Sequence, residues 1–206
     1  MHDKLLIIGA GGHGKVCADI AMKMKKWTEI SFLDMDMSKK EILGLKIIDI
    51  PENLNQYVDN YDFFISIGNN HIREHIASEI GNSNGELATL IHPSANIGID
   101  VKIGKGTAIM AGVSVNSGTT LGVGVIINTN SSVDHDCIIK NYTHVSPGVT
   151  IAGTVNIGSN CWIGTGANLV NSINIPPYTI IGAGGVVINS ILEQGTYVGV
   201  PVNKIK

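Results

Sequence analysis

The chain has 206 residues, of which 44% are hydrophobic and 15% charged, so it can bury a substantial core and is not typical of a disordered protein. The net charge is −3 without a long run of like charges, which argues against a nucleic-acid partner. No stretch reaches the roughly 18 apolar residues of a membrane span, and the three cysteines form no C-x-x-C pair. We therefore expect a cytoplasmic protein with no membrane span, no disulfide framework and no classical zinc site.

Residues 1–86 show the alternation of helix and strand that is typical of a small α/β domain with a parallel sheet. The turn-forming segment Gly81–Glu86 marks its end. The apolar patterns predict strands over Lys4–Ile8, Ile30–Leu33 and Tyr61–Ile67, and helices over Gly12–Lys25 and Asn70–Ile80.

A glycine-rich turn, GAGGHG at Gly9–Gly14, lies between the first strand and the first helix and matches G-x-G-x-x-G. Glycines there let a phosphate approach backbone N–H groups at a helix start, and Asp34, at the end of the next strand, is placed to bind a ribose. NAD needs two mononucleotide-binding halves, and this domain provides one. We therefore favour a nucleotide joined to another group, such as a nucleotide-sugar; a glycine turn without a ligand is the alternative.

From Ile91 to Val187 an aliphatic residue recurs at every sixth position, and each of these seventeen residues is Ile, Val or Leu. This repeat resembles the hexapeptide family, whose fold is a left-handed parallel β-helix. Three short strands would form each triangular coil, with the aliphatic side chains inside. We expect residues 87–206 to form this domain, with the residues after Val187 as its cap. Cys137 and Cys161 lie on the inward track and are interpreted as core packing.

Two histidine motifs lie within the repeat: VDHDC at Val133–Cys137, and YTHVSPG at Tyr142–Gly148, which contains His144. Both histidines lie off the inward track, so their side chains are predicted to project from the β-helix. The flanking carboxylates stabilise the protonated form of His135 and make it a better base. A solvated surface histidine is the alternative. No serine-hydrolase, zinc-protease or P-loop motif occurs.

The combination of the glycine turn with a histidine-bearing hexapeptide domain resembles the sugar O- and N-acyltransferases of bacterial surface-glycan synthesis. It is most similar to the acetyl-CoA-dependent N-acetyltransferases of UDP-4-amino-sugars of the bacillosamine type. The resemblance implies a homotrimer with active sites between subunits, acetyl-CoA as co-substrate and no metal. It is carried by the segments IIGAGGHGKVCADIA, YDFFISIGNNHIREHI, INTNSSVDHDC, YTHVSPGVTIAGTVNIG and YVGVPVNKI.

The resemblance also implies roles for individual residues. His135 matches the general base, Asp136 the acid that raises its basicity, and the Gly153 N–H the donor to the thioester oxygen. Asn128 and Asp134 match positions that line the sugar pocket. The acetyl-CoA contacts implied are His144, Thr165, Ala183 and Gly184. The nucleotide-sugar contacts implied are Gly11, Gly12, His13, Asp34 and Gly68. The relatives have two consecutive acids after the second strand, where this chain has Asp34-Met35-Asp36.

The predicted reaction is the direct attack of the 4-amino group of a UDP-linked amino-deoxy sugar on acetyl-CoA, without a covalent acyl-enzyme. A sialic acid O-acetyltransferase is the first alternative, although free sialic acid lacks the nucleotide for which the glycine turn is suited. A γ-type carbonic anhydrase needs three zinc-binding histidines, and only His135 and His144 are suitably placed. An NAD-dependent oxidoreductase and a non-catalytic sensor of nucleotide-sugars are the remaining alternatives.

Overall fold

The computed structural model describes residues 2–206 and divides into two compact units, of which the first ends at Pro93 and the second runs from Ser94 to Lys206. Met1, the first residue of the predicted N-terminal domain, lies outside the described residues. The boundary comes later than the predicted end of that domain at Glu86. One reason is that β6 (Glu86–Leu87) pairs with β5 (Asp62–Ile65) and so extends the sheet of the first unit. Beyond β6, the Ile91 N–H donates to Met24 Sδ of the same unit at 3.4 Å.

The first unit is an α/β domain around one six-stranded sheet with the order β3-β4-β2-β1-β5-β6. All pairs are parallel except β3–β4. Its remaining strands are β1 (Lys4–Ile8), β2 (Glu29–Leu33), β3 (Glu41–Ile42) and β4 (Leu45–Asp49), and β7 (Leu90–Ile91) follows just before the boundary. The predicted strands and helices are present, with ends that differ by a few residues.

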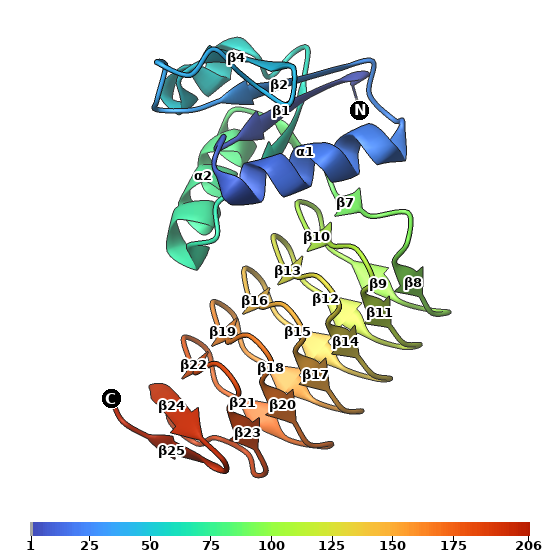
Figure 1. Cartoon of the computed structure of the whole chain (residues 1–206), viewed down its shortest axis with the longest axis vertical. Coiled ribbons are helices and arrows are strands. Elements are labelled where there is room, and N and C mark those ends of the chain that lie inside the picture. Colours follow the sequence, from blue (N-terminus) through green and yellow to red (C-terminus); the bar gives the residue numbers. More distant parts are fainter. Residues whose placement is uncertain (1) are drawn as a thin grey trace. The chain divides into compact units, whose positions relative to one another are not determined.

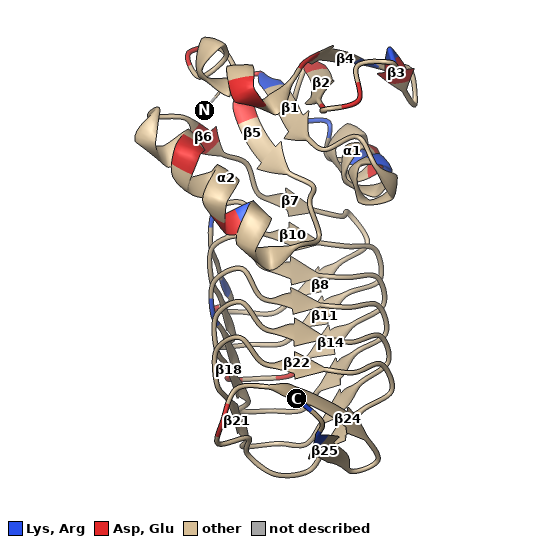
Figure 2. Cartoon of the chain, turned by 90° about the vertical axis from the view of Figure 1, so that its left-hand side faces the viewer, with Lys and Arg blue, Asp and Glu red and all other residues tan. Residues whose placement is uncertain are grey.

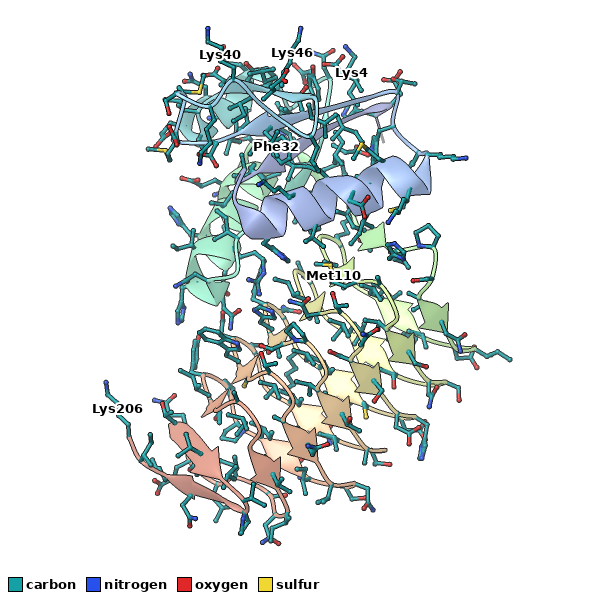
Figure 3. The ribbon with its side chains drawn as sticks, in the orientation of Figure 1. Lys4, Phe32, Lys40, Lys46, Met110 and Lys206 are labelled. Atoms are coloured by element: carbon teal, nitrogen blue, oxygen red, sulfur yellow. The ribbon has the colours of Figure 1, made fainter. Side chains whose placement is uncertain are left out.

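Two helices cover this sheet, α1 (Gly12–Met24) and α2 (Asn70–Asn82). The core between sheet and helices holds Phe32, labelled in Figure 3, together with Phe63 and Phe64, all at most 1% exposed. Burying aromatic side chains of this size is a large part of what stabilises a small domain. The central strands β1 and β5 are therefore fixed in place, and so are the loops that follow them.

The hairpin β3–β4 and the short 3-10 helix η1 (Pro51–Gln56) were not predicted. The hairpin turns at Leu43 and Gly44, whose φ angles of 52° and 75° lie in the left-handed region. Glycine adopts such angles at no steric cost, but leucine rarely does. Of the two turn residues, only Gly44 is therefore typical of a hairpin turn, and the sequence did not predict one here.

The second unit is a left-handed parallel β-helix, whose two-residue strands form three faces (Figure 1). Face I contains β10 (Ala108–Ile109), β13 (Ile126–Ile127), β16 (His144–Val145), β19 (Trp162–Ile163) and β22 (Ile180–Ile181). Face II contains β8 (Asn96–Ile97), β11 (Ser114–Val115), β14 (Ser132–Val133), β17 (Thr150–Ile151), β20 (Asn168–Leu169) and β23 (Val186–Val187). Face III contains β9 (Lys102–Ile103), β12 (Thr120–Leu121), β15 (Ile138–Ile139), β18 (Asn156–Ile157) and β21 (Asn174–Ile175).

The hexapeptide repeat explains this geometry. The second residue of each strand is the repeating aliphatic, and from Ile109 onward these side chains are almost completely buried. Each strand pairs with the strand that follows three hexapeptides later, as Val133 does with Ile151. Corner hydroxyls satisfy backbone groups that the strands leave free; Thr143, for example, donates to the Gly158 carbonyl at 2.7 Å. Each outward position therefore lies beside its counterpart in the next coil.

The predicted cap is a hairpin of β24 (Thr196–Gly199) and β25 (Val202–Lys204), in which β24 extends face I beyond β22. The ribbon of the coils in Figure 2 is mostly tan, because charged residues are sparse there. Among residues 2–206, no helix combines the length and apolar character that crossing a membrane requires. The few charged side chains along the coils therefore stand out as site candidates.

Candidate active site

The predicted base, His135, lies at the corner between faces II and III, directly after β14. Its Nδ1 lies 2.9 Å from Asp136 Oδ2. Asp136 has a φ of 56°, a left-handed conformation that aspartate tolerates better than most residues, and this turn brings its carboxylate back to the imidazole. The carboxylate favours the tautomer with its proton on Nδ1, which leaves the Nε2 lone pair free to accept a proton.

The electrostatic surroundings strengthen this base. The hydrogen bond to Asp136 raises the pKa of His135 above its usual value, and the negative charge of Asp134 adds to the effect. Asp134 is held in turn by Asn116 Nδ2 at 2.7 Å and by the His135 backbone N–H at 2.8 Å. The hydrogen bond from Asn116 is the main reason that the pKa of Asp134 is lowered. Asp134 is therefore suited to remain charged beside the imidazole.

Gly153 lies one coil below His135, under its imidazole ring. A Cβ at this glycine would come within 2.5 Å of His135 Nε2, so only glycine leaves room for the ring in this position. The Gly153 carbonyl accepts from Ser172 N. Within the described residues, no protein acceptor receives the Gly153 N–H. A free N–H close to the Nε2 of a base is the arrangement that an oxyanion donor requires.

The second predicted histidine, His144, lies on face I and belongs to a different cluster. Its Nε2 is 3.2 Å from Asn128 Nδ2. Its ring is parallel to that of Trp162, with 6.1 Å between the ring centroids. The indole Nε1 of Trp162 donates to Ser146 Oγ at 2.9 Å. The structure thus brings Asn128, which was predicted to contact the sugar, together with His144, which was predicted to contact acetyl-CoA.

Thr165, Ala183 and Gly184 gather at the corner that follows face I. All three are exposed, and the Gly184 N–H donates to the Thr165 carbonyl at 2.8 Å. Gly164 lies so close to the backbone of the next coil that a Cβ there would come within 2.6 Å of Ala183 N. The corner therefore presents small residues and backbone groups, a surface that a slender pantetheine chain can follow.

One copy of the chain does not bring all these residues together. One group lies on face I or at its edge toward face II: Asn128, His144 and the corner formed by Thr165, Ala183 and Gly184. His135, Asp136 and Gly153 lie at the opposite edge of face II. The strands of face II separate the two groups.

The nucleotide-binding residues predicted in the first unit lie at one edge of its sheet. Strands β2, β1 and β5 are adjacent and parallel, so the residues that follow them meet at their carboxyl ends. These residues are the glycine turn after β1, Asp34 after β2 and Gly68 after β5. Ser66 joins two of the loops, because its Oγ donates to the Gly9 carbonyl at 2.6 Å. This edge is where ligands bind in open α/β sheets.

The glycines of the turn have different tasks. A Cβ at Gly14 would overlap the Gly9 carbonyl oxygen, so Gly14 permits the close packing of α1 on the strand end. A Cβ at Gly11 or Gly12 meets no other atom within 4 Å. Asp34 also supports the turn, because its Oδ2 accepts from the Ala10 N–H at 2.5 Å. Gly11 and Gly12 therefore keep backbone open toward solvent, as a bound phosphate requires.

His13, the side chain within the turn, is largely buried. Burial and the nearby charge of Arg73 lower its pKa to about 4, so the imidazole is neutral at pH 7. A cavity of about 610 Å³ lies close by, with Met35 beside Asp34 and Ile67 beside Gly68 in its wall. Neither this cavity nor Arg73 was predicted from the sequence.

No set of three or more His, Cys, Asp or Glu side chains in residues 2–206 could hold a metal ion. All three cysteines are buried, and burial raises the pKa of Cys17 and Cys161. These thiols therefore remain protonated and pack as small apolar groups, as predicted for Cys137 and Cys161.

The site partners that sequence reasoning missed in the second unit follow one rule. Asn116 precedes Asp134 by one coil, and Trp162 follows His144 by one coil. A search of the printed sequence at an offset of three hexapeptides would have found both. Arg73 and Ser66 in the first unit follow no such periodicity.

Comparisons with known proteins agree with this fold. The family model described as the PglD N-terminal domain matches residues 4–80. The UDP-N-acetylbacillosamine N-acetyltransferase of Bacillus subtilis (strain 168) is 34% identical over 109 residues, which make up 51% of this chain and 50% of that protein. The match thus spans about half the length of this curated relative.

Two solved structures are similar over nearly their whole length. The acetyltransferase domain of PglB from Neisseria gonorrhoeae FA1090, in complex with acetyl coenzyme A, is 36% identical with a TM-score of 0.96, and the match covers 100% of both chains. PerB from Caulobacter crescentus, in complex with CoA and GDP-perosamine, is 31% identical with a TM-score of 0.93, covering 98% of this chain and 97% of that one.

The α/β unit followed by a left-handed β-helix is thus the fold class that the sequence predicted. The chain belongs to the bacillosamine-type sugar N-acetyltransferase family.

Proposed function

We propose that this protein is an acetyl-CoA-dependent N-acetyltransferase that acts on the 4-amino group of a UDP-linked amino-deoxy sugar. The observation that carries the proposal is the His135 arrangement: a carboxylate on Nδ1, a free Nε2 and an unoccupied N–H at Gly153 beneath it. The product would serve bacterial surface-glycan or glycoprotein-glycan synthesis. Acetyl-CoA and nucleotide-sugars are cytoplasmic metabolites, so we place the reaction in the cytoplasm.

The proposed mechanism uses the groups around His135. The neutral sugar amine attacks the thioester carbon, and His135 Nε2 takes a proton from the nitrogen as the tetrahedral intermediate forms. The Gly153 N–H stabilises the oxyanion. The C–S bond then breaks, and coenzyme A leaves as a thiolate that can take up the proton. Asp136 holds the imidazole and stabilises the imidazolium.

We propose that separate groups of residues bind the nucleotide, the sugar and acetyl-CoA. We assign the nucleotide to Gly11, Gly12, His13, Asp34 and Gly68, the sugar to Asn128 and Asp134, and acetyl-CoA to His144, Thr165, Ala183 and Gly184. The nucleotide supplies binding energy that can orient the reacting amine. We propose UDP because the curated relative is named for a UDP-sugar, and GDP is the rival because PerB is described with GDP-perosamine.

We propose a homotrimer, which the family resemblance implies and which the separation of the residues on one β-helix supports. Since face II lies between the His135 corner and the acetyl-CoA contacts, we propose that each active site takes one group from each of two neighbouring copies. Light scattering should then give three times the chain mass. An active monomer would contradict this arrangement.

A thiol-release assay tests the reaction itself. With acetyl-CoA we expect the highest kcat/KM for a UDP-4-amino-4,6-dideoxy-sugar, a lower value for GDP-perosamine and the lowest for sialic acid. If sialic acid gives the highest value, or if removing the nucleotide leaves the rate unchanged, the O-acetyltransferase alternative replaces this proposal. Absence of turnover with every acceptor would favour a sensor of nucleotide-sugars.

A further inference from the structure

Arg73 is an unusual member of the core of the first unit. It is 1% exposed and the bulkiest of the fully buried side chains. Burial of a guanidinium is unfavourable unless hydrogen bonds compensate for its lost hydration. Its place near the N-terminus of α2 also sets a positive charge against the positive end of the helix dipole. Stability of the helix alone therefore does not account for an arginine at this position.

The guanidinium fixes the loop between β5 and α2. Its Nη1 donates to the Ile67 carbonyl at 2.9 Å and to the Gly68 carbonyl at 3.2 Å, while Nη2 donates to Asn70 Oδ1 at 2.9 Å. Three hydrogen bonds from one rigid planar group determine the path of four consecutive residues. This loop contains Gly68, which leaves the sheet beside the glycine turn because β5 and β1 are neighbours.

The charge of Arg73 also acts on the glycine turn. It contributes to the lowered pKa of His13, although burial is the larger cause. His13 is consequently neutral at pH 7, while arginine is charged at every physiological pH. Arg73 therefore supplies a permanent positive charge under the loops where we place the diphosphate.

We propose that Arg73 is a positioning residue for the nucleotide end of the substrate. It holds the loop of residues 67–70 in the shape that the nucleotide requires and adds a buried positive charge beneath the diphosphate. It need not touch the substrate, and it has no part in the acetyl transfer at His135. The inference rests on the proposed function, because it takes a nucleotide-sugar to be the acceptor.

The test compares Arg73→Met, which removes the charge and the hydrogen bonds, with Arg73→Lys, which keeps the charge but not the planar fork. Ser78→Ala, on an exposed part of the same helix, is the matched control. We expect Arg73→Met to raise KM for the UDP-amino-sugar about tenfold or more and Arg73→Lys to raise it less, with kcat and the KM for acetyl-CoA within about twofold. Turnover of the same amino-sugar without its nucleotide should not change.

The results distinguish a failure of the proposed function from a failure of the Arg73 inference. If the wild-type protein shows no dependence on the nucleotide, the proposed function fails before Arg73 is tested. Suppose instead that the wild type depends on the nucleotide. The Arg73 inference is then overturned if the folded variants keep the wild-type KM for the UDP-amino-sugar. It is also overturned if kcat falls and the KM values for both substrates rise together. Should Arg73→Met not fold, Arg73→Lys decides by the same criterion. NMR titration adds a direct readout, since loss of the arginine charge should raise the pKa of His13 from about 4.

Discussion

Side chains supply the candidate base and its acids in the β-helix, with the Gly153 N–H beside them, whereas backbone groups form most of the candidate site in the α/β unit. In the β-helix, the repeat fixes the backbone of every coil in nearly the same way, so differences between coils lie in what projects outward. His135, Asp136 and Trp162 are such outward residues. In the α/β unit, the strands end in loops of different shape, and Gly11, Gly12 and Gly68 are exposed there without a side chain to cover the backbone.

This difference predicts which substitutions affect chemistry and which affect folding. An outward residue of a coil can change without disturbing the inward aliphatic stack. A residue in the first turns of a helix, such as Gly14 of α1 or Arg73 of α2, touches the neighbouring loops, so its replacement alters the shape of the binding edge. The contrast can be tested by paired substitutions in the two units.

The largest effect is expected for His135→Ala. Loss of the base should lower kcat by about 10²–10⁴ while the thermal unfolding temperature stays near that of the wild type, because the side chain is more than half exposed. The thiol-release assay and thermal unfolding measure the two quantities, and His2→Ala is a matched control from the other unit. A variant that keeps full activity would assign the base to another residue.

The next largest effect is expected for Gly153→Ala. The new methyl group would meet the exposed imidazole, which can swing away, so the fold should persist while the base leaves its position. Displacement of a catalytic group by about 1 Å lowers rates on the order of 100-fold. Gly81→Ala, where a Cβ meets nothing within 4 Å, is the control. Unchanged kcat in the Gly153 variant would contradict the stacked arrangement.

A smaller effect is expected in the α/β unit for Gly12→Val. The side chain has free space in the protein itself, so it should obstruct only the nucleotide and weaken UDP binding about tenfold in a calorimetric titration. Gly14→Ala should behave in the opposite way and destabilise the unit by about 1–3 kcal/mol, because its methyl group overlaps Gly9.

NAD should not bind to the wild type. Tight NAD binding that UDP cannot compete away would support the oxidoreductase alternative.

The smallest effect is expected for Asp136→Asn, which keeps the turn because asparagine also tolerates left-handed angles. His135 must be neutral to act, so kcat/KM should fall as the pH drops through its pKa. Without the carboxylate this pKa is lower, so the acid limb of the profile should move to lower pH while the plateau falls several-fold. A limb that stays in place would exclude Asp136 as the cause of the raised pKa.

The β-helix could be predicted from the sequence almost coil by coil, because an aliphatic residue recurs at every sixth position from Ile91 to Val187. The corner pair His135–Asp136 was predictable for the same reason. In the α/β unit the positions of the glycine turn and Asp34 were predictable, because the carboxyl ends of adjacent parallel strands lie at the same edge of the sheet. The hairpin at Leu43, the buried Arg73 and the end of the unit at Pro93 were not, because each depends on contacts between segments with no common period.

The strict spacing of the coils also limits how this part of the chain can change length during evolution. Duplication or loss of one whole coil away from His135 returns every later residue to its own face and leaves the inward stack continuous. A change of a single hexapeptide would preserve the stack but turn everything beyond it onto the next face. Any other length would bring polar residues into the interior. We therefore expect tolerated insertions and deletions between related chains to come as whole coils, or as loops that bulge from a corner.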